Sequence, residues 1–133
     1  MATVFEKLNL KDHQQILILN APASFEPELS RLPVLTIYRH VESVPAVRFS
    51  LAFVTHQSEV DKLAAQIAER AQGDAIVWFA YPKGTSKKYK CDFNRDTGWD
   101  TLKSAGFDTV RAIAIDEDWT ALRFRRNEFI KTR

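Results

Sequence analysis

The sequence predicts an α/β fold with a mostly parallel sheet, helices packed on it and an antiparallel last strand. Ala75–Tyr81 is a continuous apolar run of strand length, which is typical of a strand buried on both faces of a parallel sheet. Strand-like and helix-like segments alternate along much of the chain, as they do where helices connect parallel strands. Only a short polar turn separates Thr109–Ile115 from Thr120–Arg126, which predicts a closing antiparallel hairpin.

Length and composition are those of one globular domain, residues 1–133. The chain is 45% hydrophobic and 27% charged, with a formal net charge of +2. No apolar run approaches the roughly 20 residues that cross a bilayer, and the first residues lack the features of a signal peptide. Cys91 is the single cysteine, so no intramolecular disulfide can form. We expect a single cytoplasmic domain outside any membrane.

The first part of the chain predicts a strand, a short helix and two more strands. Gln14–Asn20 is an apolar run closed by Pro22. Ser24 has the side chain of a helix N-cap, and Pro27 is tolerated in a first helical turn. This helix would end near Leu32. The two strands that follow are Val34–Val41 and Val47–Thr55.

The best-defined helix begins after Ser58, a residue type that caps helices. One continuous apolar stripe runs along it, formed by Val60, Leu63, Ala64, Ile67 and Ala71. Gly73 fits the left-handed position that follows a helix. A shorter helix is expected after the lysine-rich loop, capped by Asp96 or Thr97 and ended by Gly106. The predicted order is β-α-β-β-α-β-α-β-β.

Two segments resemble the signatures of a bacterial family of small Rossmann-like domains with no assigned function. They are Trp78-Phe-Ala-Tyr-Pro-Lys-Gly-Thr-Ser86 and Ala114-Ile-Asp-Glu-Asp-Trp-Thr-Ala-Leu-Arg-Phe-Arg125. The family pattern is roughly W-x-x-Y/W-P-K followed by A-I/V-D-x-x-W-S/T-A-L/I-R, and Thr120 stands where we expect serine. The resemblance covers the chain from about Gln14 to Arg126. It implies a Rossmann-like fold and the location of a site, not an activity.

The closing strand order also resembles the end of class I methyltransferases, whose last strand is inserted antiparallel. A nucleotide or S-adenosylmethionine site of that kind needs a glycine-rich turn after the first strand, so that the backbone can approach the ligand closely. The turn here is Asn20-Ala-Pro-Ala-Ser-Phe25, which contains no glycine, and Pro22 removes a backbone donor. We therefore expect no cofactor.

Polar, charged and aromatic residues follow several of the predicted strands, at the carboxyl ends where ligands of such sheets gather. The residues expected to form a ligand-binding edge are Asn20, Tyr81, Lys83, Ser86, Asp116 and Trp119. The lysines after Tyr81 would bind a small anionic ligand, or would form a solvated basic loop.

Three residues at this edge could take part in catalysis. Asp116 is a candidate general base beside Lys83, and His56 ends a strand at the same predicted edge. Alternatively, Lys83 or Arg95 forms a surface ion pair with Asp116 or Asp118, and the contact is structural. No His or Cys spacing supports a metal, so none is predicted.

The function favoured by the sequence is a small non-catalytic binding or regulatory domain. The alternative is a Rossmann-type enzyme that acts on or with a nucleotide-like cofactor, as methyltransferases do. A third function is nucleic-acid binding through the basic loop and the C-terminal arginines, which the near-neutral net charge opposes. Self-association stays open, because Phe129 and Ile130 could pack on the domain or on a neighbour.

Overall fold

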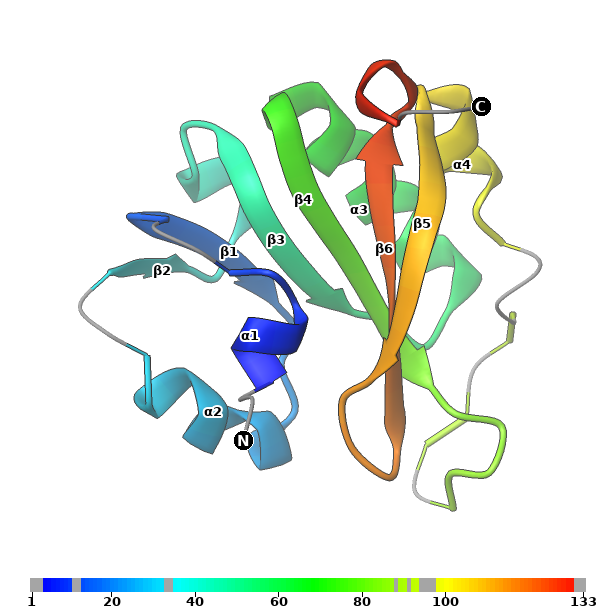
Figure 1. Cartoon of the computed structure of the whole chain (residues 1–133). Coiled ribbons are helices and arrows are strands. Elements are labelled where there is room, and N and C mark those ends of the chain that lie inside the picture. Colours follow the sequence, from blue (N-terminus) through cyan, green and yellow to red (C-terminus); the bar gives the residue numbers. More distant parts are fainter. Residues whose placement is uncertain are drawn as a thin grey trace.

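The chain folds into one six-stranded sheet, seen in Figure 1. The computed structural model describes residues 4–10, 13–32, 35–87, 89–90, 92–93 and 98–130. The strand order is β2-β1-β3-β4-β6-β5. The strands are β1 (Gln15–Leu19), β2 (Thr36–Tyr38), β3 (Val47–Phe53), β4 (Ala71–Pro82), β5 (Phe107–Ala114) and β6 (Trp119–Arg126). The first four pair in parallel, and β6 is antiparallel to both of its neighbours. The predicted fold class and the antiparallel last strand are confirmed.

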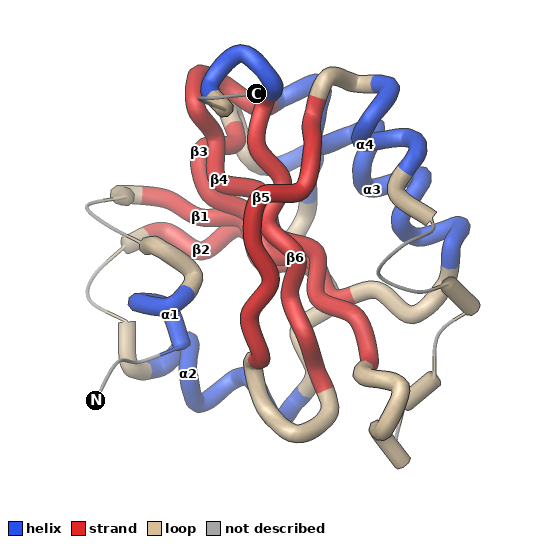
Figure 2. The backbone as a smooth tube through the Cα atoms, turned by 45° about the vertical axis from the view of Figure 1, so that its right-hand side comes forward, coloured by secondary structure: helices blue, strands red, loops and turns tan. Residues whose placement is uncertain are grey.

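Short helices cover the sheet on both sides (Figures 1 and 2). The front face carries α1 (Val4–Lys7) and α2 (Glu26–Ser30), and the rear face carries α3 (Gln57–Arg70) and α4 (Asp100–Ser104). Three single 3₁₀ turns complete the fold: η1 (Ala23–Phe25), η2 (Val41–Ser43) and η3 (Asn127–Phe129). No helix in the described part of the chain is long and apolar enough to cross a membrane.

The sheet separates two apolar clusters. Strand β4 contributes to both, because Trp78 packs in the front cluster and Phe79 in the rear one, and neither side chain is exposed. On the front face the indole Nε1 of Trp78 donates a hydrogen bond of 2.8 Å to the carbonyl of Leu8, which anchors the chain just after α1. The continuous apolar run therefore marks a strand buried on both faces, as predicted.

The helix α3 differs from its prediction at both ends. It begins at Gln57 with His56 as N-cap, so Ser58 lies inside the first turn. One carboxylate oxygen of Glu59 accepts the backbone N–H groups of Thr55 and His56, at 2.8 and 3.0 Å, and so closes this end. Gly73 does adopt a left-handed conformation, with φ of 57°, but it lies within β4 rather than at the end of the helix.

Other boundaries shift by a few residues. Ser24 belongs to η1 and does not cap α2, whose N-cap is Phe25. The second strand shortens to Thr36–Tyr38, and the single turn α1 has no counterpart in the prediction. Gly106, with φ of 93°, follows α4 as expected. The proposed caps Asp96 and Thr97 lie outside the described residues, as do Lys88, Cys91 and Arg95.

Candidate functional site

The carboxyl ends of β1, β3 and β4 meet at one edge of the sheet. Chain direction across the sheet reverses between β1 and β3, because β2 lies on one side of β1 and β3 lies on the other. Ligands of open α/β sheets bind in the crevice outside the carboxyl ends at such a switch point. Asn20 directly follows β1 there, with φ of 58°, in the left-handed conformation that glycine usually supplies. Its side-chain amide donates a hydrogen bond of 3.3 Å to the carbonyl of Phe53, the last residue of β3.

A cavity of about 300 Å³ lies beside this turn, and we call it the β1–β2 cavity. It combines basic, acidic and amide side chains with an apolar floor. It is lined by Leu19, Asn20, Arg39, His40, Val41, Glu42, Glu59, Lys62, Leu63 and Gln66. The lining therefore offers both donors and acceptors to a polar ligand, and its volume is at the lower end of the range for small-molecule sites.

Two charged residues at the β1–β2 cavity already have partners. The guanidinium of Arg39 donates to both carboxylate oxygens of Glu26, at 2.9 and 3.0 Å, and these bonds lower the pKa of Glu26. One carboxylate oxygen of Glu59 accepts backbone hydrogen bonds at the N-terminus of α3, as described above. No ion pair involving Glu42 or Lys62 is present in the described part of the chain, so these two side chains are available to a ligand.

A second cavity, of about 280 Å³, lies at the end of β4, and we call it the β4 cavity. It is lined by Tyr81, Pro82, Lys83, Gly84, Ser86, Tyr89, Lys90 and Phe93. Three of the predicted ligand residues, Tyr81, Lys83 and Ser86, therefore share one cavity, whereas Asn20 lines the other. Two lysines together with three aromatic rings suit a planar or apolar ligand that carries negative charge.

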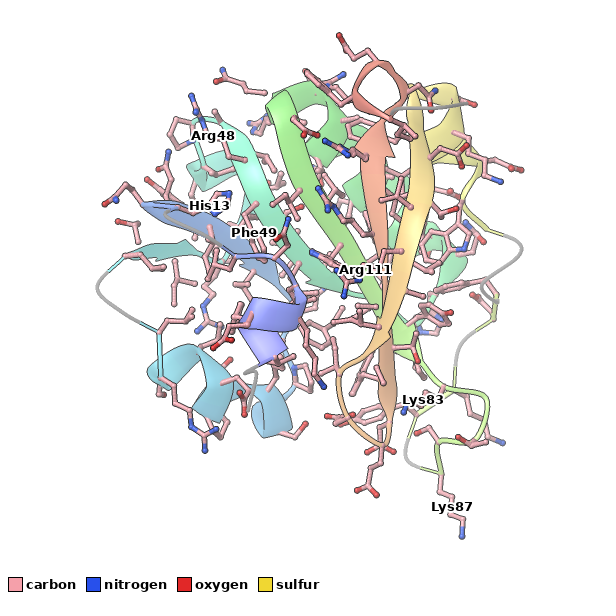
Figure 3. The ribbon with its side chains drawn as sticks, viewed as in Figure 1. His13, Arg48, Phe49, Lys83, Lys87 and Arg111 are labelled. Carbon is pink, nitrogen blue, oxygen red and sulfur yellow. The ribbon has the colours of Figure 1, made fainter. Side chains whose placement is uncertain are left out.

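One backbone and one side-chain hydrogen bond connect the loop after β4 to the acidic turn. The N–H of Lys83 donates to the carbonyl of Asp118 at 2.8 Å, and the hydroxyl of Ser86 donates to the Asp118 carboxylate at 2.9 Å. No ion pair of the Lys83 side chain is present among the described residues, and Arg95, the other residue expected to pair with this turn, lies outside them. Figure 3 shows Lys83 and Lys87 on this loop, with Lys87 pointing away from the sheet.

Asp116 has a structural role in the turn between β5 and β6. One carboxylate oxygen accepts the N–H groups of Asp118 and Trp119, at 2.8 and 2.9 Å. Such a carboxylate-closed turn is common where a hairpin needs a tight reversal. Asp116 lies outside the lining of the β4 cavity that includes Lys83, and its role as a base stays a prediction.

Tyr81 and Trp119 belong to opposite faces of the sheet. Trp119 is 3% exposed and packs on the front face between Phe53 and Tyr89, with ring centroids 5.1 and 4.9 Å away. Tyr81 packs on the rear face against Trp99. Of the six residues expected at one ligand edge, Asn20 therefore lines the β1–β2 cavity, Tyr81, Lys83 and Ser86 line the β4 cavity, and Asp116 and Trp119 line neither.

His56 lies at the start of α3, apart from the acidic turn. Its Nδ1 is 3.8 Å from a carboxylate oxygen of Asp92, and both side chains are more than half exposed. The other oxygen of Asp92 accepts the N–H of Gln57 at 2.6 Å, so this carboxylate also closes the helix. No cluster of His, Cys, Asp and Glu among the described residues could hold a metal ion.

Comparison with solved structures identifies proteins that share the fold. A SAM-dependent methyltransferase from Aquifex aeolicus superimposes with a TM-score of 0.62 at 13% identity, over 92% of this chain and 87% of that one. The chain has a Rossmann-like, methyltransferase-type fold. A putative type 11 methyltransferase from Sulfolobus solfataricus gives 0.55 at 7% identity, over 90% and 88% of the two chains. A putative S-adenosylmethionine dependent methyltransferase from Listeria monocytogenes gives 0.53 at 11% identity, over 93% and 98%.

The likeness is limited to the fold, because a shared fold at such identities hosts many functions. No protein-family model matches the chain, and no curated protein matches it in sequence. The sequence did not indicate Glu42, Lys62 or Gln66 as site residues. These side chains become neighbours only because η2 and α3 pack together beside Leu19. No local sequence pattern predicts that packing.

Proposed function

We propose that this protein binds S-adenosylmethionine, or a closely related adenosyl ligand, in the β1–β2 cavity. The observation that carries the proposal is the left-handed turn at Asn20 beside a cavity at the topological switch point. Asparagine tolerates this conformation better than other residues with a side chain, so the turn forms without glycine. The likeness in fold to a SAM-dependent methyltransferase supports the same class of ligand. This proposal revises the expectation that no cofactor binds.

The residues of the cavity fit such a ligand by their chemistry. S-adenosylmethionine carries a carboxylate, an ammonium group and ribose hydroxyls, and when bound it supplies an electrophilic methyl group. The ammonium of Lys62 would hold the carboxylate, while the carboxylate of Glu42 would accept hydrogen bonds from hydroxyl or ammonium groups. Leu19 and Leu63 give the adenine ring an apolar surface.

The β4 cavity is the proposed site of a second, negatively charged ligand. It lies at the end of a strand of the same parallel set, and its lysines Lys83 and Lys90 would neutralise an anionic group. If methyl transfer occurs, the acceptor molecule would bind here, and the loop that Asp118 holds would shape its specificity.

Binding of the adenosyl ligand is tested by calorimetry with two variants of α3. Gln66→Trp places an indole in the β1–β2 cavity, whereas Glu69→Trp puts the same side chain on the exposed face of the same helix. We expect S-adenosylmethionine and S-adenosylhomocysteine to bind the wild type and Glu69→Trp alike, and to lose at least tenfold in affinity with Gln66→Trp. A wild type that shows no heat and no thermal stabilisation at millimolar ligand rejects the proposal, because a ligand at 100 times its dissociation constant adds about 2.7 kcal/mol.

A non-catalytic binding domain is the second candidate, and a specific observation favours it. Pro22 supplies no donor to a ligand, and the pairing of Arg39 with Glu26 occupies the end of β2, where the ribose of a dinucleotide normally meets an acidic residue. Here the β4 cavity would bind an anionic ligand alone. Stabilisation by small aromatic acids that Lys83→Gln abolishes, with no effect of S-adenosylmethionine, would identify this function.

A further inference from the structure

Three arginines share the front face of the β5–β6 hairpin, away from both cavities. Arg111 lies directly opposite Arg123 in the antiparallel pair, and Arg125 is the next residue of β6 on that face. This pairing continues the unbroken register that runs from the turn of the hairpin, and a β-bulge interrupts the ladder just beyond it, between Arg111 and Thr109. Figure 3 shows Arg111 in front of the sheet, in the region that neither α1 nor α2 covers.

Only one of the three has an acidic partner. Arg125 donates to both carboxylate oxygens of Asp74, at 2.8 and 2.6 Å. Arg111 and Arg123 form no ion pair or hydrogen bond through their side chains within the described part of the chain. Asp108 is the cross-strand neighbour of Arg125, and one of its carboxylate oxygens accepts a hydrogen bond from the N–H of Thr109. Two adjacent guanidinium groups therefore remain without a counter-charge of their own.

Arg123 is the more confined of the two. Its strand neighbour on the front face is Trp78, and its Nε is buried with no hydrogen-bond partner. Burial lowers the pKa of Arg123, and the nearby positive charges of Arg125 and Arg111 lower it further, against a smaller opposing effect of the Asp74 carboxylate. A buried donor without a partner costs stability in the free protein, and so do adjacent like charges. An anion placed between Arg111 and Arg123 would remove the cost of the like charges.

We propose that Arg111 and Arg123, flanked by Arg125, form a binding site for a phosphate dianion, either free or as a phosphate monoester. Two unpaired guanidiniums balance a group that carries −1.5 to −2 charges near pH 7, whereas a carboxylate would leave one of them uncompensated. The planar fork of arginine matches phosphate oxygens. The site goes beyond the proposed function, because it lies on another part of the sheet.

A monoester would also have room for its organic part. An open hollow of about 710 Å³ lies at the amino ends of the strands, lined by His13, Gln14, Gln15, Arg48, Gln72, Gly73 and Asp74. Asp74 belongs to this hollow and also binds Arg125, so the hollow borders the arginine cluster. Figure 3 shows His13 and Arg48 near the amino ends of β1 and β3.

The test compares thermal unfolding of the wild type, Arg111→Gln/Arg123→Gln and a control, Lys103→Gln, which removes one exposed charge on α4 at the rear. Inorganic phosphate, sulfate and chloride are titrated at constant ionic strength. We expect phosphate and sulfate to raise the unfolding midpoint of the wild type saturably at low millimolar concentration. The rise at ten times the dissociation constant should be about 3–6 °C. The control should respond like the wild type, and the double variant should keep only the small unsaturable rise that such salts give any protein.

Two further measurements distinguish an anion site from a purely structural role of the arginines. Without added anion the double variant should be at least as stable as the wild type, because it removes uncompensated charge; a large loss of stability would assign the arginines a structural role and reject the proposal. Between pH 7.5 and pH 5 the effect of phosphate should weaken while that of sulfate persists, because inorganic phosphate is protonated from a dianion to a monoanion over this range. An equal response of wild type and double variant to phosphate also rejects it.

The source of the phosphate is resolved with two more probes. Phenyl phosphate, which contains no adenine and so does not report on the β1–β2 cavity, should bind at least as tightly as inorganic phosphate if the site serves monoesters. Weaker binding of phenyl phosphate indicates free phosphate. A single-stranded oligonucleotide that binds through these arginines, in the absence of any saturable effect of phosphate, would overturn the proposal in favour of a nucleic-acid backbone contact.

Discussion

The variant Asn20→Gly should be more stable toward unfolding than the variant Asn20→Ala. Both substitutions lose the hydrogen bond to the carbonyl of Phe53, which contributes about 0.5–1.5 kcal/mol. Asparagine and alanine both carry a Cβ, which costs about 1–2 kcal/mol in the left-handed region near φ of 58°, whereas glycine avoids this cost. We expect Asn20→Ala to lower the free energy of unfolding by about 1 kcal/mol, and Asn20→Gly to leave it within about 0.5 kcal/mol of the wild type, because the avoided Cβ cost offsets the lost hydrogen bond.

Urea unfolding followed by tryptophan fluorescence measures this difference, since Trp78, Trp99 and Trp119 are all buried. Ala65→Gly on the exposed face of α3 is the matched control, and there glycine should be the worse residue by about 1 kcal/mol. If Asn20→Ala equals or exceeds Asn20→Gly in stability, the turn is not left-handed in solution, and the argument for a glycine-like cofactor turn is lost.

Three further predictions concern contacts that hold the fold. Asp74→Asn should lower the free energy of unfolding near neutral pH by at most about 1 kcal/mol, because the ion pair with Arg125 is about a third exposed. Since Arg125 lowers the pKa of Asp74, the gap from wild type should close as the pH falls below the ordinary aspartate value of 3.8 in acid titrations of stability. Trp78→Phe should cost about 1–3 kcal/mol by leaving the Leu8 carbonyl unpaired, and should speed hydrogen exchange in residues 4–10; unchanged exchange there would contradict the anchoring role. Glu59→Ala should cost about 1 kcal/mol in urea unfolding, whereas Glu59→Gln, which keeps an acceptor oxygen, should recover most of it.

The parts of the fold that could be predicted are those that local sequence determines. Burial on both faces requires apolar residues at successive positions, so the run through Trp78 and Phe79 identifies β4 without tertiary knowledge. The single turn α1 could not be found in this way. Its four residues are too few for a helical period, and a hydrogen bond from Trp78, seventy positions away in sequence, anchors the chain beside it.

The candidate site was less accessible to prediction, for two physical reasons. Residue type alone cannot exclude a left-handed turn, because asparagine adopts positive φ at moderate cost. The absence of glycine after β1 was therefore not sufficient reason to exclude a ligand at Asn20. The arrangement of the arginines depends on register, since a shift of one residue in the hairpin pairing would place Val110 or Ala112 opposite Arg123 and turn Arg111 to the rear. The residues of the two strands do not by themselves fix that register.

The β1–β2 cavity itself follows from an unusually short connection. A crossover between parallel strands usually takes a dozen or more residues and includes a helix, but residues 39–46 alone join β2 to β3 across β1. They form the single turn η2, whose Val41 carbonyl accepts a 2.9 Å hydrogen bond from Arg70 of α3. One turn cannot fill the space that a full helix would occupy on the rear of β1 and β2, so a hollow remains between η2 and α3. Filling it from the protein side, as in Gln66→Trp, should therefore not lower the free energy of unfolding even though it blocks the ligand, and a strongly destabilised Gln66→Trp would show that the space is not open in solution.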